Sequence, residues 1–206
     1  MHDTDRTEPD HRLLFEIAAS QRGYFTAGQA RECGFGWDLL AYHAKTGRFQ
    51  RVQRGLYRLR DYPSSMHEEV VAAWLAVGKD IAVVSHESAL ELLELSDVIP
   101  SAVHLTVPRD KRYLRPPPDT VIHTTVVPVP RRDTVVREGI RMTSPSRTIV
   151  DAAEAGTDPD QVVKAVRQAL RHGVTTEHHL RSEVQDRDAD VGQLIEMAIE
   201  TMVTHT

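Results

Sequence analysis

Apolar residues near the start of the chain recur at helical spacing. A first helix is predicted over residues 12–22, with an inward side made of Leu13, Leu14, Ile17 and Ala18. A second, short helix is predicted at residues 27–33, because Thr26 is a favourable N-cap residue and Gly34 follows the last turn. The glycine-containing turn at residues 34–36 then joins this helix to a third one.

The next stretch, residues 37–60 with the sequence WDLLAYHAKTGRFQRVQRGLYRLR, changes from a helical pattern to a hairpin pattern. Gly47 ends the predicted helix, whose apolar face consists of Leu40, Ala41 and Ala44. The tip of the hairpin is predicted at residues 53–55, and its buried side is expected to contain Phe49, Val52, Leu56, Tyr57 and Leu59. Helix, short helix, turn, helix and hairpin is the order of a winged helix-turn-helix.

The polar sides of this third helix and hairpin are basic. They are expected to present Asp38, Tyr42, Lys45 and Thr46 on the helix, and Arg51, Arg54 and Arg58 on the hairpin. No carboxylate follows Asp38 within residues 37–60, although the formal net charge of the chain is -5. A helix in the major groove beside a hairpin along the phosphates would use such groups. The alternative is a solvated helix and an exposed hairpin with no nucleic-acid partner.

A turn-rich segment after the hairpin predicts a joint between two domains. Residues 61–65 read DYPSS, so we expect domains at residues 1–62 and 63–206. An apolar strand at residues 81–84 should be buried on both faces. Further strands are predicted at residues 103–107, 121–127 and 140–142, and helices at residues 66–77, 86–95, 158–171, 176–185 and 191–202 and from Pro145. The predicted fold class is α+β, with an N-terminal winged helix-turn-helix followed by a mixed α/β C-terminal domain.

Composition limits the kinds of site and the cellular compartment that we expect for the protein. The single cysteine, Cys33, excludes an internal disulfide and a cysteine-cluster zinc site. No apolar run has membrane length and no basic, hydrophobic leader is present, so a cytoplasmic protein is expected. Basic residues gather in residues 1–61 and 109–147, whereas residues 62–108 and 148–206 are acidic. This alternation favours a confined contact with nucleic acid over general coating.

The sequence offers little support for catalysis. The residues two positions before the four lysines are His43, Val77, Arg109 and Val162, so the acidic residue of a restriction-type nuclease site is absent. His86 and Glu87 are adjacent and would point about 100 degrees apart on a helix. His104, His123 and Asp151 could be imagined around a metal, but they lack the HExxH pattern. We therefore expect no enzyme activity, no metal and no cofactor. Arg147 and Asp151, four residues apart on a helix, are expected to pair or to hold a neighbouring element.

Five segments, taken in order and spacing, resemble the abortive-infection AbiEi-type antitoxins over roughly residues 10–170. They are GYFTAGQA at residues 23–30, GRFQRVQRGLYRL at residues 47–59, SHESAL at residues 85–90, HLTVP at residues 104–108 and TSPSRTIVD at residues 143–151. The resemblance implies a transcriptional autorepressor of a type IV toxin–antitoxin system. Its N-terminal winged helix would bind inverted repeats in its own promoter. Its C-terminal domain would antagonise a co-transcribed, nucleotidyltransferase-like toxin.

The resemblance also implies where these contacts lie. The DNA-binding residues expected from it are Tyr42, Lys45, Thr46, Arg48, Arg51, Arg54 and Arg58. No motif identifies the residues that act against the toxin, and the candidate surfaces are the C-terminal helices and a basic loop containing Arg109, Lys111, Arg112 and Arg115. The alternative function is that of a transcriptional regulator whose C-terminal domain senses a ligand or dimerises. A neighbouring toxin gene would favour the antitoxin.

Overall fold

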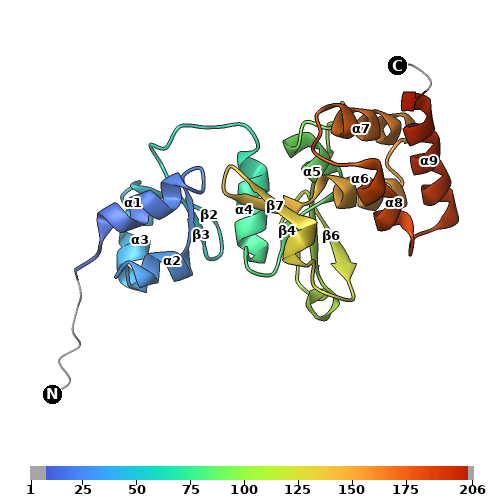
Figure 1. Cartoon of the computed structure of the whole chain (residues 1–206). Helices are drawn as coiled ribbons and strands as arrows, with labels where there is room; N and C mark the ends of the chain where they lie inside the picture. Colours follow the sequence, from blue (N-terminus) through green and yellow to red (C-terminus); the bar gives the residue numbers. More distant parts are fainter. Residues whose placement is uncertain (1–7, 204–206) are drawn as a thin grey trace. The chain divides into compact units, whose positions relative to one another are not determined.

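A computed structural model describes residues 8–203 of the chain. The chain divides into two compact units, one ending at Gly78 and the other beginning at Lys79 (Figure 1). Helix α4 (Glu68–Val77) belongs to the first unit, because it packs against strands of that unit. The boundary that we expected after residue 62 is therefore corrected to Gly78. The turn-rich segment at residues 61–65 is a connection inside the N-terminal unit.

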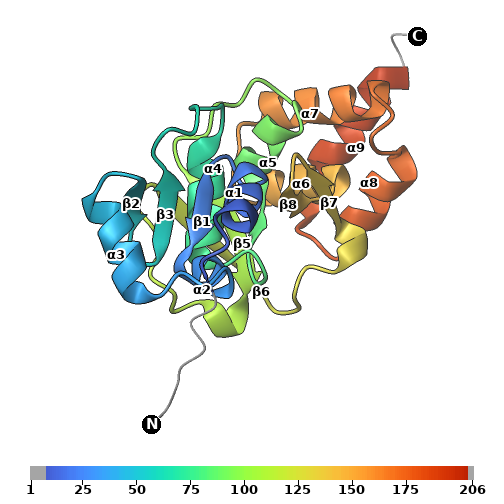
Figure 2. The same cartoon turned by 90° about the vertical axis from the view of Figure 1, so that its left-hand side faces the viewer.

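The N-terminal unit follows the predicted order of elements, and α4 is added at its end. Its first six elements are α1 (His11–Ala19), β1 (Tyr24–Thr26), α2 (Ala27–Glu32), α3 (Trp37–Lys45), β2 (Phe49–Gln53) and β3 (Leu56–Leu59). The three strands form an antiparallel sheet in the order β1-β3-β2 (Figure 2). This arrangement has the element order expected of a winged helix-turn-helix.

Caps and buried aromatic rings fix the short helices of this unit. The Asp10 side chain accepts a hydrogen bond from the backbone of α1, and Thr26 and Gln29 form a reciprocal capping box at the start of α2. Such caps satisfy backbone N–H groups that have no partner within the helix. Phe25 and Phe49 pack edge to face, with ring centroids 5.0 Å apart. Leu40 of α3 and Phe49 of the hairpin belong to one buried apolar cluster, so α3 and the hairpin share a core.

The C-terminal unit is a five-stranded mixed sheet with helices gathered at one side (Figure 1). Its strands are β4 (Val83–Val84), β5 (Val103–Pro108), β6 (Thr120–Thr125), β7 (Thr134–Arg137) and β8 (Ile140–Thr143). Its α-helices are α5 (His86–Leu92), α6 (Pro145–Glu154), α7 (Pro159–Arg171), α8 (Glu177–Val184) and α9 (Ala189–Val203). The strand order is β6-β5-β4-β8-β7, and the β4–β8 and β5–β6 pairs are parallel. Within the described residues, no helix has the length and apolar character needed to cross a membrane.

The position of β4 explains its apolar sequence. β4 lies in the middle of the sheet, and Val83 and Val84 are buried, so the prediction of a strand covered on both faces is confirmed. A large apolar core in the same unit joins α5, α6, α7, α8 and α9. β7 was not predicted, because it is a four-residue edge strand without an apolar alternation that would separate it from a loop. The predicted α+β fold class is confirmed.

Candidate nucleic-acid interface and C-terminal pocket

Helix α3 presents a polar and aromatic side to solvent. Its buried side consists of Leu40 and His43, and burial lowers the pKa of His43, with further lowering from the charge of Arg48. The expected apolar face is therefore corrected at one position, because Ala41 is exposed and His43 takes its place. His43 lies against the ring of Phe49 in β2, so this histidine acts as a core residue.

The β2–β3 hairpin contains an irregularity that the sequence did not predict. The strand register shifts between Arg51 and Gln53, which is the mark of a β-bulge. The intervening Val52 is consequently exposed and does not contribute to the core as expected. At the tip, the backbone carbonyl of Gly55 accepts a hydrogen bond 2.8 Å long from the amide of Ala27. This bond fixes the hairpin to the start of α2.

Most of the residues predicted to contact DNA are open to solvent. Figure 2 shows α3 beside the β2–β3 hairpin, and the exposed residues on these two elements and their connection include Tyr42, Lys45, Thr46, Arg48, Arg51 and Arg54. Over residues 8–203, no ion pair occupies the four basic side chains of this set. The structure therefore offers several free cations on one helix end and its adjoining hairpin. Their role in DNA binding stays a prediction.

Arg58 does not belong to this surface. Only 8% of the residue is exposed, and its guanidinium lies 3.1 Å from the Glu68 carboxylate and 3.2 Å from the Pro63 carbonyl oxygen. It also lies over the ring of Tyr24. β3 is the middle strand of its sheet, and α4 packs against it, so the side of β3 that we expected to face DNA is covered. We therefore remove Arg58 from the predicted interface.

Sequence reasoning missed an aromatic residue beside this surface. Trp37 at the start of α3 is 61% exposed, and the guanidinium of Arg31 lies 5.6 Å from the centroid of its ring. The available signal was its position, since the residues at the start of a recognition helix often contact base edges.

The basic loop proposed to act against a toxin is exposed and internally paired. Arg109–Lys111 forms one turn of 3-10 helix, and Lys111 pairs with Asp110 at 3.1 Å. Arg112 donates a hydrogen bond to the Tyr113 hydroxyl and lies over its ring. Arg115 is also exposed. These residues share one loop, and a role against a toxin stays a prediction.

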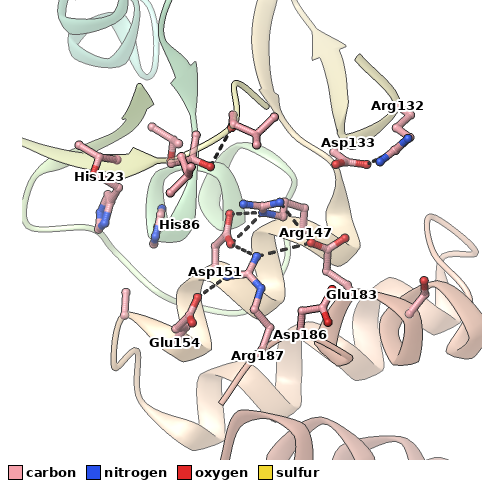
Figure 3. A pocket seen from close by; sticks show the side chains of 17 residues that line it. His86, His123, Arg132, Asp133, Arg147, Asp151, Glu154, Glu183, Asp186 and Arg187 are labelled. Carbon is pink, nitrogen blue, oxygen red and sulfur yellow. Dashed lines mark hydrogen bonds and ion pairs between the residues drawn. The ribbon is translucent and has the colours of Figure 1, made fainter. Parts of the chain in front are cut away.

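A second feature, in the C-terminal unit, is a polar pocket with a volume of about 970 Å³ (Figure 3). It collects residues that lie far apart in the sequence. His86 comes from α5, His123 from β6, Asp151 from α6 and Glu183 from α8, and Arg187 follows α8. From the sequence we considered His123 and Asp151 together only as possible metal ligands, and we did not predict a pocket that brings them together with His86, Glu183 and Arg187.

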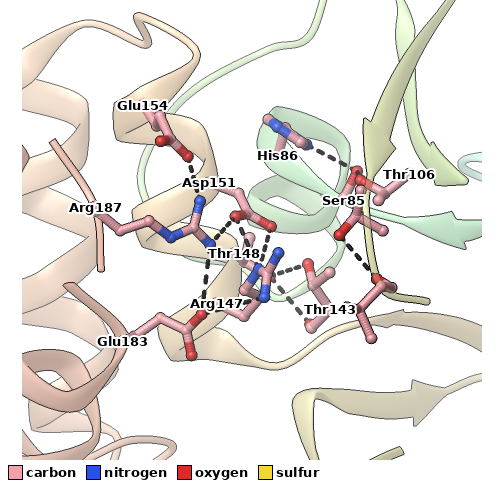
Figure 4. Close-up of polar contacts among 12 residues, drawn as sticks. Ser85, His86, Thr106, Thr143, Arg147, Thr148, Asp151, Glu154, Glu183 and Arg187 are labelled. Atoms are coloured by element: carbon pink, nitrogen blue, oxygen red, sulfur yellow. Dashed lines mark hydrogen bonds and ion pairs between the residues drawn. The ribbon is translucent and has the colours of Figure 1, made fainter. Parts of the chain in front are cut away.

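A network of charged groups forms one wall of the pocket (Figure 4). Both carboxylate oxygens of Asp151 accept hydrogen bonds from the Nε of Arg147 at 2.8 Å, as predicted for this pair. Asp151 also accepts a bond of 2.7 Å from Arg187. Arg147 and Arg187 lie 3.4 and 3.5 Å from the Glu183 carboxylate, and Arg187 bonds to Glu154. The network links α6, α8 and the segment that follows α8.

Two histidines, His86 and His123, line another part of the pocket, and His104 contacts His123. The rings of His86 and His123 are stacked with centroids 3.5 Å apart, and a nitrogen of His104 lies 3.0 Å from one of His123. Burial lowers the pKa of His86 to about 2 and that of His123 to about 4, and neighbouring histidines add to both effects. These two rings are therefore neutral near neutral pH.

Hydroxyl groups determine which nitrogen of His86 carries its proton. Thr106 donates to the Ser85 hydroxyl at 2.8 Å, and the Ser85 oxygen lies 2.8 Å from Nδ1 of His86. Ser85 is fully buried, so its own hydrogen needs a partner, and Nδ1 is the acceptor available. The neutral ring then carries its proton on Nε2.

The histidine and acidic residues do not form a metal site. Among the described residues, no group of three histidine, cysteine, aspartate or glutamate side chains has a geometry that could hold a metal ion. Glu87, which follows His86, accepts a hydrogen bond of 3.0 Å from Thr157 and so holds α5 to the segment before α7. His86 and Glu87 thus have separate sets of partners.

Comparisons with known proteins concern the N-terminal unit and the fold of the chain. Residues 12–60 match the family model described as transcriptional regulator, AbiEi antitoxin, and this segment is therefore similar to the regulators of that family. The crystal structure of RV2827C protein from Mycobacterium tuberculosis aligns with 92% of this chain and 75% of that chain, with a TM-score of 0.58. The two sequences are 16% identical, so this likeness shows the fold alone. A comparison with curated proteins gives no match.

Proposed function

We propose that this protein is a cytoplasmic, DNA-binding repressor of its own promoter and the antitoxin of an abortive-infection toxin–antitoxin system. The family match at residues 12–60 supports the regulator role. The observation that carries DNA binding is the set of exposed cations on α3, the hairpin and their connection that have no ion-pair partner among residues 8–203, namely Lys45, Arg48, Arg51 and Arg54. The proposal gives the chain no catalytic role and no cofactor.

In this proposal, α3 enters the major groove and the hairpin follows the phosphate backbone. Tyr42 and Thr46 on α3 and its C-terminal end would contact base edges or sugars, and the free cations would neutralise phosphates. The two-fold symmetry of an inverted-repeat promoter would require two copies of the chain, one for each half-site. The C-terminal unit would act against a co-transcribed, nucleotidyltransferase-like toxin, either by contact or indirectly. Its basic loop at residues 109–115 is the candidate surface.

Promoter binding is tested with a gel-shift titration of the upstream DNA of the gene. Saturable binding that weakens steeply with salt supports the proposal, whereas equal affinity for unrelated DNA at moderate salt contradicts a specific repressor. The antitoxin role is tested by expressing the neighbouring gene with and without this protein. Rescue of growth supports it, and the absence of any toxic neighbour contradicts it.

A second candidate function is a transcriptional regulator whose C-terminal unit senses a small ligand. The pocket of about 970 Å³ favours this function, because cavities of this size with convergent polar groups are typical ligand sites. A change in promoter affinity upon ligand binding would support it.

A further inference from the structure

The charges around the C-terminal pocket favour a positively charged ligand. Five carboxylates line the pocket, from Asp133, Asp151, Glu154, Glu183 and Asp186. Three guanidinium groups line it, from Arg132, Arg147 and Arg187. The two lining histidines add no charge near neutral pH, since burial lowers the pKa of both. The lining of the pocket therefore carries more negative than positive groups.

The two half-buried arginines of the pocket are already paired. Arg147 and Arg187 share the carboxylates of Asp151 and Glu183, whereas the exposed Arg132 lies 3.5 Å from Asp133. A phosphate or carboxylate that entered the pocket would have to displace these partners. It would also meet the remaining carboxylates at short range, which is unfavourable in a partly buried site.

Two carboxylates, Glu183 and Asp186, accept no side-chain hydrogen bond among the described residues, so both retain acceptor capacity for a cation, although Glu183 already lies near two arginines. Asp186 lines the pocket and forms no ion pair among the residues that the structure describes. Burial raises the pKa of Glu183, and Arg147 and Arg187 at 3.4 and 3.5 Å oppose this effect only in part. A further positive group beside Glu183 would stabilise its ionised form.

His86 supplies an independent indication of a ligand. It is 7% exposed and lines the pocket (Figure 3), where its Nε2–H has no hydrogen-bond partner among residues 8–203. The hydroxyl pair Thr106 and Ser85 holds the ring in place, so the Nε2–H is presented to the pocket in a fixed orientation. An acceptor on a bound molecule would satisfy it.

We propose that this pocket binds a small molecule in which an amine or guanidinium cation lies near a hydrogen-bond acceptor such as a carbonyl oxygen. The cation contacts Glu183 and Asp186, and the acceptor receives the Nε2–H of His86. This assignment does not depend on DNA binding or on a toxin, because it concerns a site built entirely from the C-terminal unit.

Isothermal titration calorimetry on the full-length protein at low salt tests the proposal with matched probes. L-argininamide carries the cation and a carbonyl group, whereas agmatine carries the same guanidinium without the carbonyl. We expect saturable binding of L-argininamide, and binding of agmatine weaker by about tenfold, because agmatine lacks the carbonyl group that would accept the hydrogen bond of His86. Inorganic phosphate and ATP should not bind. Saturable binding of phosphate, or no binding of either cation by the folded protein, would overturn the proposal.

Two further measurements sharpen the result. Asp186→Asn should weaken L-argininamide binding by about fivefold or more, and Asp160→Asn, which removes an exposed carboxylate of α7 outside the pocket, should leave it unchanged. Equal effects of the two variants would mean nonspecific charge attraction. N-acetyl-L-argininamide imitates an arginine inside a protein chain. If it bound more tightly than the free amide, the site would belong to a protein partner and the small-molecule proposal would be wrong.

Discussion

The Arg58 guanidinium lies 3.1 Å from the Glu68 carboxylate, and this ion pair connects the middle strand of the N-terminal sheet to helix α4. It separates Arg58 from the other basic residues of the hairpin, which are exposed. It also explains why the N-terminal unit extends to Gly78, since α4 supplies the partner of a largely buried charge.

Arg58→Ala should therefore destabilise the protein without changing the salt dependence of DNA binding. Removal of one partner of a mostly buried pair leaves the Glu68 carboxylate uncompensated, and we expect a loss of about 2 to 3 kcal/mol in the free energy of unfolding. Urea denaturation measures this loss. Arg60→Ala, at an exposed position, is the matched control and should cost less than about 0.5 kcal/mol. Equal stabilities of the two variants would argue against the ion pair.

Asp151→Asn should destabilise the C-terminal unit. Asp151 is buried and compensates both Arg147 and Arg187, so the substitution leaves two guanidinium groups short of negative charge. We expect a loss of about 3 kcal/mol. Glu154→Gln is the control, because its side chain is 44% exposed and contacts only Arg187 within this network. Denaturation curves that fail to rank the two variants in this order would contradict the proposed role of Asp151.

Stability should fall as the pH is lowered below about 6.5, the ordinary pKa of histidine. The folded protein lowers the pKa of His86 to about 2 and that of His123 to about 4, so the unfolded chain binds more protons between these values and pH 6.5. Each of these histidines lowers the free energy of unfolding by about 1.4 kcal/mol for every pH unit between its unfolded-state pKa and its folded-state pKa. Arg147 and Arg187 add to the effect at His86, and Asp151 opposes it at His123. Denaturation at pH 7, 6 and 5 measures the slope, and constant stability across this range would contradict the buried, neutral histidines.

Trp37 should report on DNA binding directly. Its ring is 61% exposed at the start of α3, whereas the other tryptophan, Trp74, is buried. In a Trp74→Phe variant, the remaining fluorescence should change when promoter DNA is added, because α3 is proposed to enter the groove. If this variant binds DNA and the emission of Trp37 does not change, the DNA does not contact the start of α3.

Local patterns predicted much of the fold because short-range physics determines it. The N-cap at Thr26 and the apolar run at residues 81–84 each specify a local structure, and both were found. The errors arose where the result depends on how strands pair or on a later segment of the chain. The exposure of Val52 depends on a bulge in strand pairing, and the burial of Arg58 depends on α4, and neither can be seen in the hairpin sequence.

The two candidate sites also differ in how far the sequence alone could predict them. The proposed DNA surface is nearly continuous in sequence, so exposed residues such as Lys45 and Arg54 could be named from residues 37–60. The pocket combines His86, His123 and Arg187 from three separated segments, and its shape depends on how β6 and the C-terminal helices pack. The predicted pairing of Arg147 with Asp151 was the one local signal that pointed to it.

The central claim is that the exposed cations of α3 and the hairpin neutralise DNA phosphates. The most direct test measures promoter affinity over a series of salt concentrations for the wild type and the double variant Arg51→Ala, Arg54→Ala. The plot of log affinity against log salt should become shallower by about 0.9 for each phosphate that the variant no longer neutralises, or about 2 units in all. An unchanged slope in a folded double variant would show that the hairpin does not lie on the DNA backbone.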